Sequence, residues 1–348
     1  MLHPPDAAGC DVVGCDPRQA RTGVTYAGRE THIRLHRQDT LMTDIACANA
    51  GYRRLFDSTG LSFGVGFPLT GERTGTPAIE DEVRLASHAE AVGFDGLWAR
   101  DVPTYWPRFG DAGGAFDTWP LLSHVAAHTD DVALGTSSIV LPLRHPIHVA
   151  KSAATVDQLS AGRLVLGVAS GDRDPEYPAF DVEPDDRGAL VREHVDALRA
   201  LWGEEYPTLE GSWGRMDGNL DVVPKPTTET LPLLPTGYAR QSIEWIAEHG
   251  DGWLFYHLPD DTLQSHLDDW RGLAGDKPFV IAVRVGLADD PAADPEHLHL
   301  GYRAGVEWFR QYFRRLEAFG LDHVIVGLEA ENPQQAMTTF ADEIIDEL

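Results

Sequence analysis

Residues 132–171 constrain the fold more than any other part of this chain. A β-branched run at 132–141 is followed by a helical run at 145–159 and a second apolar run at 163–168. Two strands joined through a helix over so short a distance form a βαβ unit, whose strands are parallel. Small polar residues follow both strands, at the edge where parallel α/β proteins place their ligands. The sequence therefore predicts an α/β fold with a ligand site at the carboxyl ends of its strands.

The same alternation of strand and helix continues along the chain. We predict strands at 61–67, 96–102, 132–141, 163–168, 231–236, 252–256, 279–287 and 323–327, and helices at 79–92, 120–128, 145–159, 187–202, 240–249, 262–273, 301–319 and 333–348. Eight strand–helix units fit a (β/α)8 TIM barrel. A short helix at 44–56 precedes it. Residues 204–226 interrupt the repeat, and Asp217-Gly218 there is a hairpin turn signal, so we predict an insertion after helix four.

The boundaries of the chain suggest one folded domain behind a tail. Residues 1–41 show no sustained period, whereas a cleaner pattern begins at Met42, so we predict a disordered tail (1–41) and a barrel domain (42–348). The true start could equally be Met1 or Met42. The first 20 residues lack a basic start followed by an apolar stretch, and no apolar run is long enough to span a bilayer, so we expect a cytoplasmic protein.

The net charge of the chain restricts which partners the protein can bind. The formal net charge is −27, with 55 acidic residues and only three lysines, Lys151, Lys225 and Lys277. Such a surface suits a salt-rich cytoplasm, so we expect a halophilic source, perhaps an archaeon, against the alternative of a mildly acidic mesophilic protein. Nucleic acid and anionic membranes would be repelled. Cys10, Cys15 and Cys47 do not complete a set of four ligands, so no metal site is predicted.

The turn after the fifth predicted strand has the composition of an anion site. It reads Gly237-Tyr238-Ala239-Arg240-Gln241-Ser242 and opens a predicted helix, whose free N–H groups and dipole attract anions. Gly237 permits close approach, Arg240 brings charge and Ser242 brings a hydroxyl. The alternative is an ordinary glycine-containing turn with a capped helix.

Fixed motifs carry a family resemblance. LPLRHP at 141–146, DQLSAGR at 157–163, and Gly167 and Gly171 stand at set offsets, and the similarity extends from about residue 61 to the end of the chain. In these features the chain resembles the bacterial luciferase-like superfamily of TIM-barrel flavin or deazaflavin oxidoreductases, and in particular its luciferase-type oxidoreductases. The resemblance implies an enzyme with a small-molecule substrate, FMN or alternatively F420 as cofactor, and a homo-oligomeric state.

The resemblance also implies which residues hold the cofactor. The turn at Gly237, Tyr238, Ala239, Arg240 and Ser242 would bind its phosphate. The small residues that end two strands would face its ring, and these are Thr136, Ser137, Ser138, Ala169, Ser170 and Gly171. The bond between Thr136 and Ser137 would be a cis non-prolyl peptide. Ser170 stands where relatives often have an arginine, so Arg173 or Arg240 would supply that charge.

Catalysis is predicted at the end of the second strand. Arg100 and Asp101 stand where light-emitting luciferases carry a histidine, which argues against bioluminescence. Arg100 could stabilise negative charge on a reduced flavin, or it could form a salt bridge with Asp101. We predict an FMN-dependent monooxygenase that oxidises a small organic substrate with O2 and takes reduced flavin from a separate reductase. The alternatives are F420-dependent hydride transfer and a non-catalytic flavin-binding protein.

Overall fold

A ten-stranded, mostly parallel sheet organises the described part of the chain. The computed structural model describes residues 47–57, 60–71, 75–106, 108 and 115–348, so the predicted boundary at 41/42 lies outside the described residues. The strands of the sheet are β1 (Ser62–Gly66), β2 (Gly96–Ala99), β3 (Ala133–Val140), β4 (Leu164–Ala169), β7 (Leu233–Pro235), β8 (Trp253–Tyr256), β9 (Phe279–Leu287), β10 (Glu296–Leu298), β11 (Gly301–Ala304) and β12 (His323–Leu328). The α/β class is therefore confirmed.

The order of the strands follows the predicted succession of parallel neighbours. One arm runs β1–β2–β3–β4–β7 and the other runs β1–β12–β9–β8, all in parallel pairs. The ends of the two arms, β7 and β8, are joined by one isolated parallel bridge, Thr236 to Leu254, in place of a ladder. All eight predicted strands are present within a few residues of their predicted bounds.

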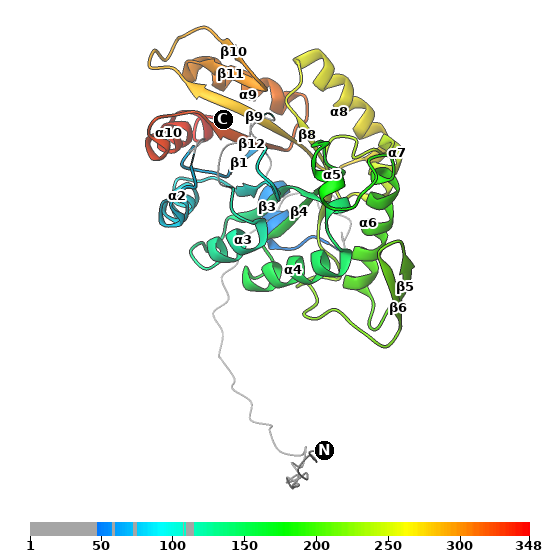
Figure 1. Cartoon of the computed structure of the whole chain (residues 1–348). Helices are drawn as coiled ribbons and strands as arrows, with labels where there is room; N and C mark the ends of the chain where they lie inside the picture. Colours follow the sequence, from blue (N-terminus) through cyan, green and yellow to red (C-terminus); the bar gives the residue numbers. More distant parts are fainter. Residues whose placement is uncertain (1–46, 58–59, 72–74, 107, 109–114) are drawn as a thin grey trace, which may run out of the picture. The chain divides into compact units, whose positions relative to one another are not determined.

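Helices cover the outside of the sheet (Figure 1). They are α2 (Ile79–Ala91), α3 (Thr118–Ala126), α4 (Pro146–Leu159), α5 (Glu176–Ala179), α6 (Arg187–Gly203), α7 (Ile243–His249), α8 (Asp260–Ala274), α9 (Val306–Ala318) and α10 (Pro333–Phe340), with a 3₁₀ turn at Leu141–Leu143 and a π-helical turn at Ala341–Ile345. Their apolar faces and the outer faces of the strands form one large core. The sequence predicted these helices from the 3.6-residue period of that apolar face, except for the short α5 and the two irregular turns, which it did not predict.

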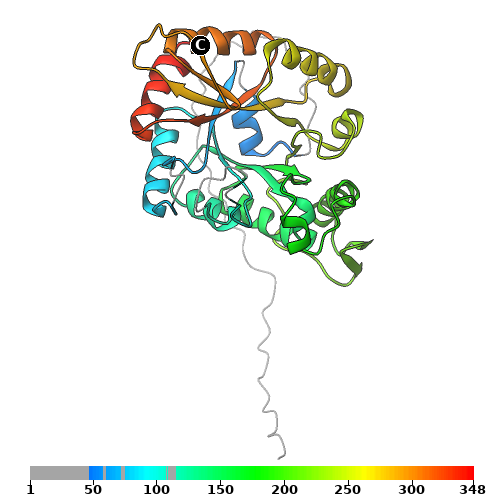
Figure 2. The ribbon, with the colours of Figure 1, turned by 45° about the horizontal axis from the view of Figure 1, so that its top comes forward.

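A second, smaller core fills the space enclosed by the strands. Helix α1 (Ala50–Phe56) inserts Tyr52 and Leu55 among Trp98, Val165 and Leu254, which come from strands of both arms. Figure 2 shows α1, in blue, between strands of the two arms. Asn49 caps α1 and also donates to Asp157 (3.0 Å) and to the Leu164 carbonyl (2.7 Å), which fixes the helix to the sheet. The helix therefore closes the amino-terminal end of the strands.

The floor of this inner core contains a buried histidine. Trp98 Nε1 donates to His323 Nε2 at 3.0 Å, and His323 Nδ1 lies 2.7 Å from Ser62 Oγ. The Trp98 indole fits only because Gly135 has no side chain, since a Cβ at Gly135 would lie 2.2 Å from the ring. Complete burial lowers the pKa of His323 to about 3.

The predicted hairpin is present but displaced. Strands β5 (Thr208–Gly211) and β6 (Gly214–Asp217) form a separate two-stranded antiparallel sheet after α6. Its turn is Ser212-Trp213, so the prediction of a turn at Asp217-Gly218 is wrong. Glu193 on α6 sets the position of the turn, because it accepts from the Ser212 N–H and hydroxyl, both at 2.8 Å.

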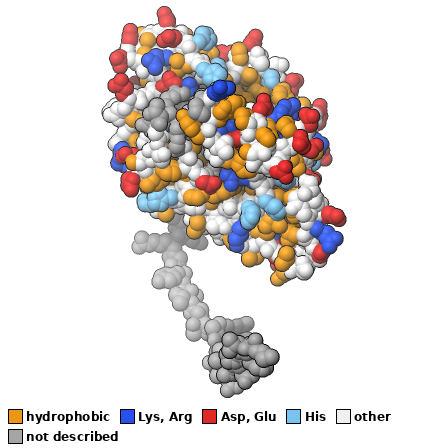
Figure 3. Space-filling model, viewed as in Figure 1, with side chains coloured by type: hydrophobic (Ala, Val, Ile, Leu, Met, Phe, Trp, Pro, Cys, Tyr) orange, Lys and Arg blue, Asp and Glu red, His pale blue; other side chains and the backbone are white. Residues whose placement is uncertain are grey.

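Two further predictions need correction. The helix predicted at 301–319 begins with a strand, because residues 301–304 pair in parallel with the second half of β9 and only α9 is helical. The short β10 then pairs antiparallel with β11. The helix predicted at 240–249 begins at Ile243, because Ala239 and Arg240 have φ of +45° and +60°, which no α-helix contains. Figure 3 shows acidic side chains spread over the viewed face, with Lys and Arg side chains between them.

Candidate active site

The carboxyl end of β3 carries an irregularity at the predicted ring site. Its pairing with β4 is regular up to Thr136, which lies opposite Leu166, and then shifts register before Ile139. The cis peptide is the bond between Ser137 and Ser138, so the predicted position, between Thr136 and Ser137, is one residue too early. Thr136 remains in the regular ladder, where its hydroxyl donates to the Gly167 carbonyl at 2.7 Å. The shift turns Ser138 toward the neighbouring strands.

Ser138 connects two predicted parts of the site. Its hydroxyl forms a hydrogen bond with the hydroxyl of Thr236, at the end of β7, and both side chains are buried. Because β4 lies between β3 and β7, this contact passes over β4 close to Gly167, two residues before Ala169. The structure therefore brings the irregular end of β3 at 137–138 close to Thr236 and the start of the turn at 237.

The turn after β7 is left-handed over most of its length. Gly237, Ala239 and Arg240 all have positive φ. The Gly237 N–H donates to Leu254 and its carbonyl accepts from Trp253 Nε1 at 2.6 Å, so Gly237 is anchored on β8. A side chain at Gly237 would strain the backbone and approach the Tyr256 ring to 3.2 Å. Its small size is thus required by the fold, whatever the turn binds.

The turn presents N–H groups without partners. In the described part of the chain, the backbone N–H groups of Tyr238, Ala239 and Arg240 make no hydrogen bond. Successive unpaired N–H groups in a turn with left-handed residues attract anions. Ser242 is different, because its hydroxyl accepts from the Trp245 N–H to cap α7 and donates to the Glu244 carboxylate, whose pKa this bond lowers. Ser242 is therefore already engaged as a helix cap.

The end of β4 faces an arginine that the sequence did not single out. Ser170 is buried, and Gly171, at φ +85°, lies against the hydroxyl of Tyr177 on α5. Arg187, the first residue of α6, donates from Nη1 to that hydroxyl at 2.7 Å and lies over the Tyr177 ring. Burial raises the pKa of the Tyr177 phenol, and Arg187 opposes the shift. No local motif indicates this contact, which depends on tertiary packing.

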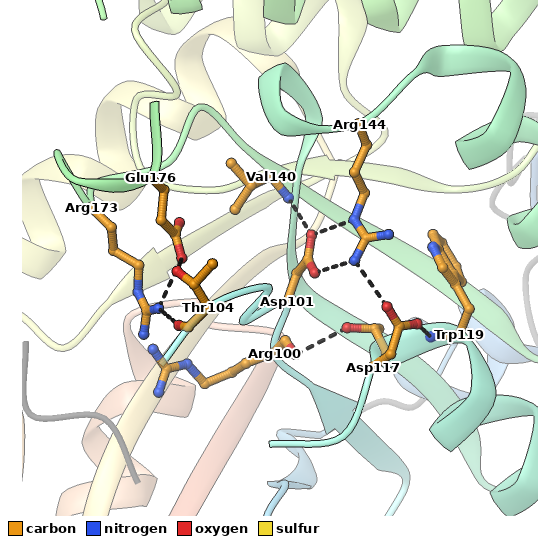
Figure 4. A network of polar contacts seen from close by, with 10 residues as sticks. Arg100, Asp101, Thr104, Asp117, Trp119, Val140, Arg144, Arg173 and Glu176 are labelled. Carbon is orange, nitrogen blue, oxygen red and sulfur yellow. Dashed lines mark hydrogen bonds and ion pairs between the residues drawn. The ribbon is translucent and has the colours of Figure 1, made fainter. Parts of the chain in front are cut away.

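Arg100 and Asp101 point away from each other (Figure 4). The buried Asp101 carboxylate accepts from Arg144 Nε (2.8 Å), from Arg144 Nη2 (2.6 Å) and from the Val140 N–H (3.1 Å). This clamp ties the end of β2 to the end of β3. Asp101 is therefore paired with Arg144 and not with Arg100, and its carboxylate is occupied by structural contacts. The Arg100 carbonyl accepts from Thr118, while its side chain is exposed.

Two polar groups that the sequence analysis did not nominate lie near Arg100. The surrounding protein partly removes solvent from the Asp172 carboxyl, which follows β4, and this raises its pKa. The nearby positive charges of Arg173 and Arg100 oppose the shift. Burial of its hydroxyl raises the pKa of Tyr256, at the end of β8, with Asp172 adding to the shift and Arg100 opposing it. Arg100, Asp172 and Tyr256 are therefore close enough for their charges to influence one another. The position of Asp172 after Gly171 was the only sequence signal for it.

The Arg173 side chain is buried and makes contacts within the protein. It donates to the Thr104 carbonyl at 2.8 Å and pairs with Glu176 at 3.1 Å, and Glu176 also accepts from the Thr104 hydroxyl. Figure 4 shows this pair to the left of the Asp101 clamp, with the Arg100 side chain extending below it. Arg173 is therefore a buried brace for the loop after β2, and the predicted transfer of cofactor charge to it has no support.

His145, in the LPLRHP motif, has a structural role. His145 caps α4, and its Nε2 lies 3.1 Å from the Trp213 carbonyl. A cavity of about 300 Å³, lined by Cys47, Arg199 and Asp251 among others, lies at the amino ends of the strands, away from this site. Within the described ranges, no group of three potential metal ligands occurs and no helix is long and apolar enough to cross a membrane.

The fold and site define a luciferase-like α/β oxidoreductase. Residues 62–347 match the family model of luciferase-like monooxygenases, and the chain belongs to this family. Members of the family are flavin- or F420-dependent oxidoreductases and monooxygenases, so the prediction of an enzyme is confirmed.

The chain is also similar to individual proteins of this family. An uncharacterised protein of Mycobacterium tuberculosis is 37% identical over 184 residues, 51% of this chain and 64% of that protein. The F420-dependent glucose-6-phosphate dehydrogenase of Nakamurella multipartita is 35% identical over 155 residues, 44% of each chain. The chain thus spans less than two thirds of the length of these curated relatives. Among solved structures, the oxygenating constituent of 3,6-diketocamphane monooxygenase of Pseudomonas putida, in complex with FMN, is similar with a TM-score of 0.66, 16% identity, and coverage of 83% of this chain and 99% of that one.

Proposed function

We propose that the protein is an oxidoreductase that binds reduced FMN at the carboxyl ends of its parallel strands and oxygenates a small organic substrate with O2. The observation that carries this proposal is the convergence of the β3 irregularity, the end of β4 and the turn after β7, joined by the contact between Ser138 and Thr236. Ligands of parallel α/β proteins bind at this edge.

The residues present fit a flavin mononucleotide. The unpaired N–H groups at 238–240 and the positive side chain of Arg240 suit a terminal phosphate. The small residues Ser137, Ala169 and Gly171 leave a flat ring room to approach the strand ends. Ser242 takes no part in this proposal, since its hydroxyl already caps α7.

Three side chains, Arg100, Asp172 and Asp101, have separate roles in the proposed reaction. Bound FMN supplies the electrons for oxygen activation. Arg100 places a positive charge beside the reacting atoms, where negative charge develops. Asp172, whose pKa is raised, exchanges a proton at Oδ with an oxygen of the substrate. Asp101 acts through position alone, because its clamp on Arg144 and Val140 holds the β2 end that carries Arg100.

A second candidate is hydride transfer with F420. It is favoured by the similarity to a relative named as an F420-dependent dehydrogenase. It also suits Asp172, since hydride transfer between an alcohol and a carbonyl requires a proton acceptor or donor at the oxygen. In this reaction Asp172 would move the proton at the substrate oxygen while the hydride is exchanged at the carbon.

Five finer statements, on the barrel, the insertion, the reductase, the oligomeric state and the acidic surface, belong to the same proposal. The eight parallel strands act as a (β/α)8 barrel closed by the bridge between Thr236 and Leu254, with the β5–β6 sheet as an insertion. A separate reductase supplies reduced FMN, and the protein works as a homo-oligomer. The excess of acidic residues adapts it to a salt-rich cytoplasm.

Cofactor titration tests the proposal. The purified protein is titrated with FMN, FAD and F420 by fluorescence, and then assayed for O2 uptake with reduced FMN and for F420 reduction with small alcohols. We expect FMN to bind more tightly than FAD, because the turn suits a terminal phosphate. Tenfold tighter binding of F420 than of FMN would favour the second candidate. Binding of none of the three would refute both.

A further inference from the structure

The inner face of β9 carries an arginine at the point where the inner core ends. Val280 belongs to the core around α1 and Ala282 packs against it, and since side chains alternate along a strand, Arg284 has the same orientation. The pairing with β12 agrees, because Ala282 lies opposite Ile325, a member of that core, and Arg284 lies opposite Gly327. Arg284 is therefore on the face of β9 that is turned toward the space enclosed by the strands.

This space is filled at the level of the inner core and open one step above it. A Cβ at Gly64 would lie 2.6 Å from Trp98 Nε1. Two residues further along β1, a Cβ at Gly66 would meet no described atom closer than 3.8 Å outside the adjoining residues, and the same holds at Gly327 on β12. The preceding residues of the two strands pair with each other, so the two glycines are neighbours. We call the space over Gly66 and Gly327 the glycine recess.

Arg284 borders the glycine recess and its backbone is fixed on both edges. A Cβ at Gly327 would lie 3.8 Å from the Arg284 Cγ, so the side chain passes along the recess. The Arg284 N–H donates to the Leu300 carbonyl at 2.9 Å, and a Cβ at Gly301 would lie only 2.7 Å from the Arg284 Cβ. Strands β11 and β12 thus hold this part of β9 between them. A guanidinium on a fixed backbone loses less conformational freedom when it binds a ligand.

Two arginines share one carboxylate beside the recess. Arg284 Nη1 lies 3.3 Å from Glu329 Oε1, and Arg303 Nη2, on β11, lies 3.9 Å from Glu329 Oε2. Among the described residues, the two guanidinium groups make no other polar contact. Other arginines of this acidic chain pair more closely, for example Arg199 with Asp251 at 2.6 Å. The three side chains therefore carry one positive charge in excess, and Arg284 keeps N–H donors for a ligand.

We propose that Arg284 selects the substrate by binding a carboxylate of the substrate in the glycine recess, while Arg303 holds Glu329 to one side. This inference rests on the proposed function and names its substrate class, which is small organic acids. A guanidinium has paired N–H donors that match the two oxygens of a carboxylate. The strand order β2–β1–β12–β9 puts the recess between Arg284 and the end of β2, which carries Arg100. A bound acid thus extends from Arg284 toward the reacting atoms.

The charges favour a carboxylate over a phosphate. The formal net charge of −27 repels any anion from most of the chain, so an anionic substrate needs a local cation. One positive charge in excess at Arg284, Arg303 and Glu329 matches the single negative charge of a carboxylate. A phosphate dianion would bring twice that charge toward Glu329 and would be repelled by it more strongly.

Matched ligands test the proposal. Cyclohexanecarboxylate and cyclohexanecarboxamide have nearly the same shape but differ in charge, and cyclohexyl phosphate offers a tetrahedral anion on the same ring. Dissociation constants are measured by ligand-observed NMR at constant KCl concentration for the wild-type protein and for Arg284→Gln, with far-UV circular dichroism to verify folding. We expect wild type to prefer the carboxylate to the amide by about tenfold or more. Arg284→Gln should weaken carboxylate binding by about tenfold or more and change amide binding by less than about threefold.

Two further variants distinguish ligand binding from a structural ion pair. Glu329→Gln removes the carboxylate that competes with the ligand, so cyclohexanecarboxylate should bind about threefold tighter or more, whereas a purely structural pair would leave its constant unchanged. Arg284→Lys keeps the charge without the paired donors and should fall between wild type and Arg284→Gln. As a control, Arg314→Gln removes a positive charge from α9, where its Nη2 donates to the Glu347 carbonyl, and should change neither constant.

The outcomes separate this inference from the proposed function, because no cofactor takes part in these measurements. Equal binding of carboxylate and amide by wild type, or a carboxylate constant that Arg284→Gln leaves unchanged, would overturn the inference even if FMN binds. Tighter binding of cyclohexyl phosphate than of the carboxylate would overturn the substrate class. Carboxylate binding that depends on Arg284 would uphold the anion site even if neither FMN nor F420 binds, in which case only the proposed function would be wrong.

Discussion

Protonation of His323 should make the fold lose stability in acid to an extent that the structure allows us to estimate. The ring is fully buried, with Nε2 accepting from Trp98 and Nδ1 facing Ser62, whose hydroxyl donates onward to the Leu55 carbonyl at 2.6 Å. A second ring proton would point at the Trp98 N–H. The folded state therefore holds the neutral ring, and its pKa is lowered from 6.5 to about 3.

The sign of the pH effect follows from these two values. Between pH 6.5 and 3 the unfolded chain binds a proton that the folded chain rejects, so the free energy of unfolding falls as pH falls. The slope is about 1.4 kcal/mol per pH unit, which amounts to about 2 kcal/mol between pH 7 and pH 5 and roughly 5 kcal/mol over the whole range. Above pH 6.5 the contribution of the neutral ring is fully present.

A variant isolates this contribution from that of the carboxylates. His323→Gln keeps an acceptor for Trp98 and cannot titrate. Urea unfolding at pH 7 and pH 5, in the same KCl concentration, should show that the wild-type protein loses about 2 kcal/mol more than His323→Gln on acidification, whatever the offset between the two at pH 7. His148→Gln, which changes an exposed histidine on α4, should behave as wild type. Equal losses in wild type and His323→Gln would refute the reasoning.

Three further outcomes are expected. Melting temperature and activity should rise from dilute buffer to molar KCl as screening reduces repulsion among the 55 acidic residues, and a flat or falling curve would count against the adaptation to salt. Asp101→Asn should lower the free energy of unfolding by about 2–4 kcal/mol by leaving Arg144 with only its longer contact to the Asp117 carboxylate (3.4 Å), and Asp101→Asn combined with Arg144→Gln should recover part of it in urea titrations. Asp172→Asn and Arg100→Gln should reduce kcat at least tenfold with little effect on cofactor dissociation constants, whereas a pure loss of binding would assign both residues to the cofactor.

The sequence predicted the regular part of the fold well, because each strand and helix carries its own apolar period. The errors arise where a distant contact decides the local structure. Residues 301–304 look like the start of an amphipathic helix, yet they pair with β9. The β5–β6 turn is set by Glu193, which lies on another element, and no turn composition reports that.

The candidate site shows the same division. The strand ends at 136–138 and 169–171 and the turn at 237 could be predicted, since the carboxyl edge of a parallel sheet is implied by strand order. The roles of single side chains could not. Asp101 pairs with Arg144, Ser242 caps its own helix, and Arg187 reaches the end of β4 only through Tyr177. Each of these depends on which partner lies nearest after folding.

The single bridge between Thr236 and Leu254 makes the contact between β7 and β8 a weakly paired seam of the sheet. Every other pair of neighbouring parallel strands shares several residues of ladder, so thermal opening should begin between β7 and β8 and leave the remaining pairs intact. The turn at 237 lies on one side of this seam and Tyr256 on the other. A ligand that contacts both the turn at 237 and Tyr256 would hold β7 and β8 together. Amide hydrogen exchange at Gly237 and Leu254 would then slow on binding more than anywhere else in the sheet.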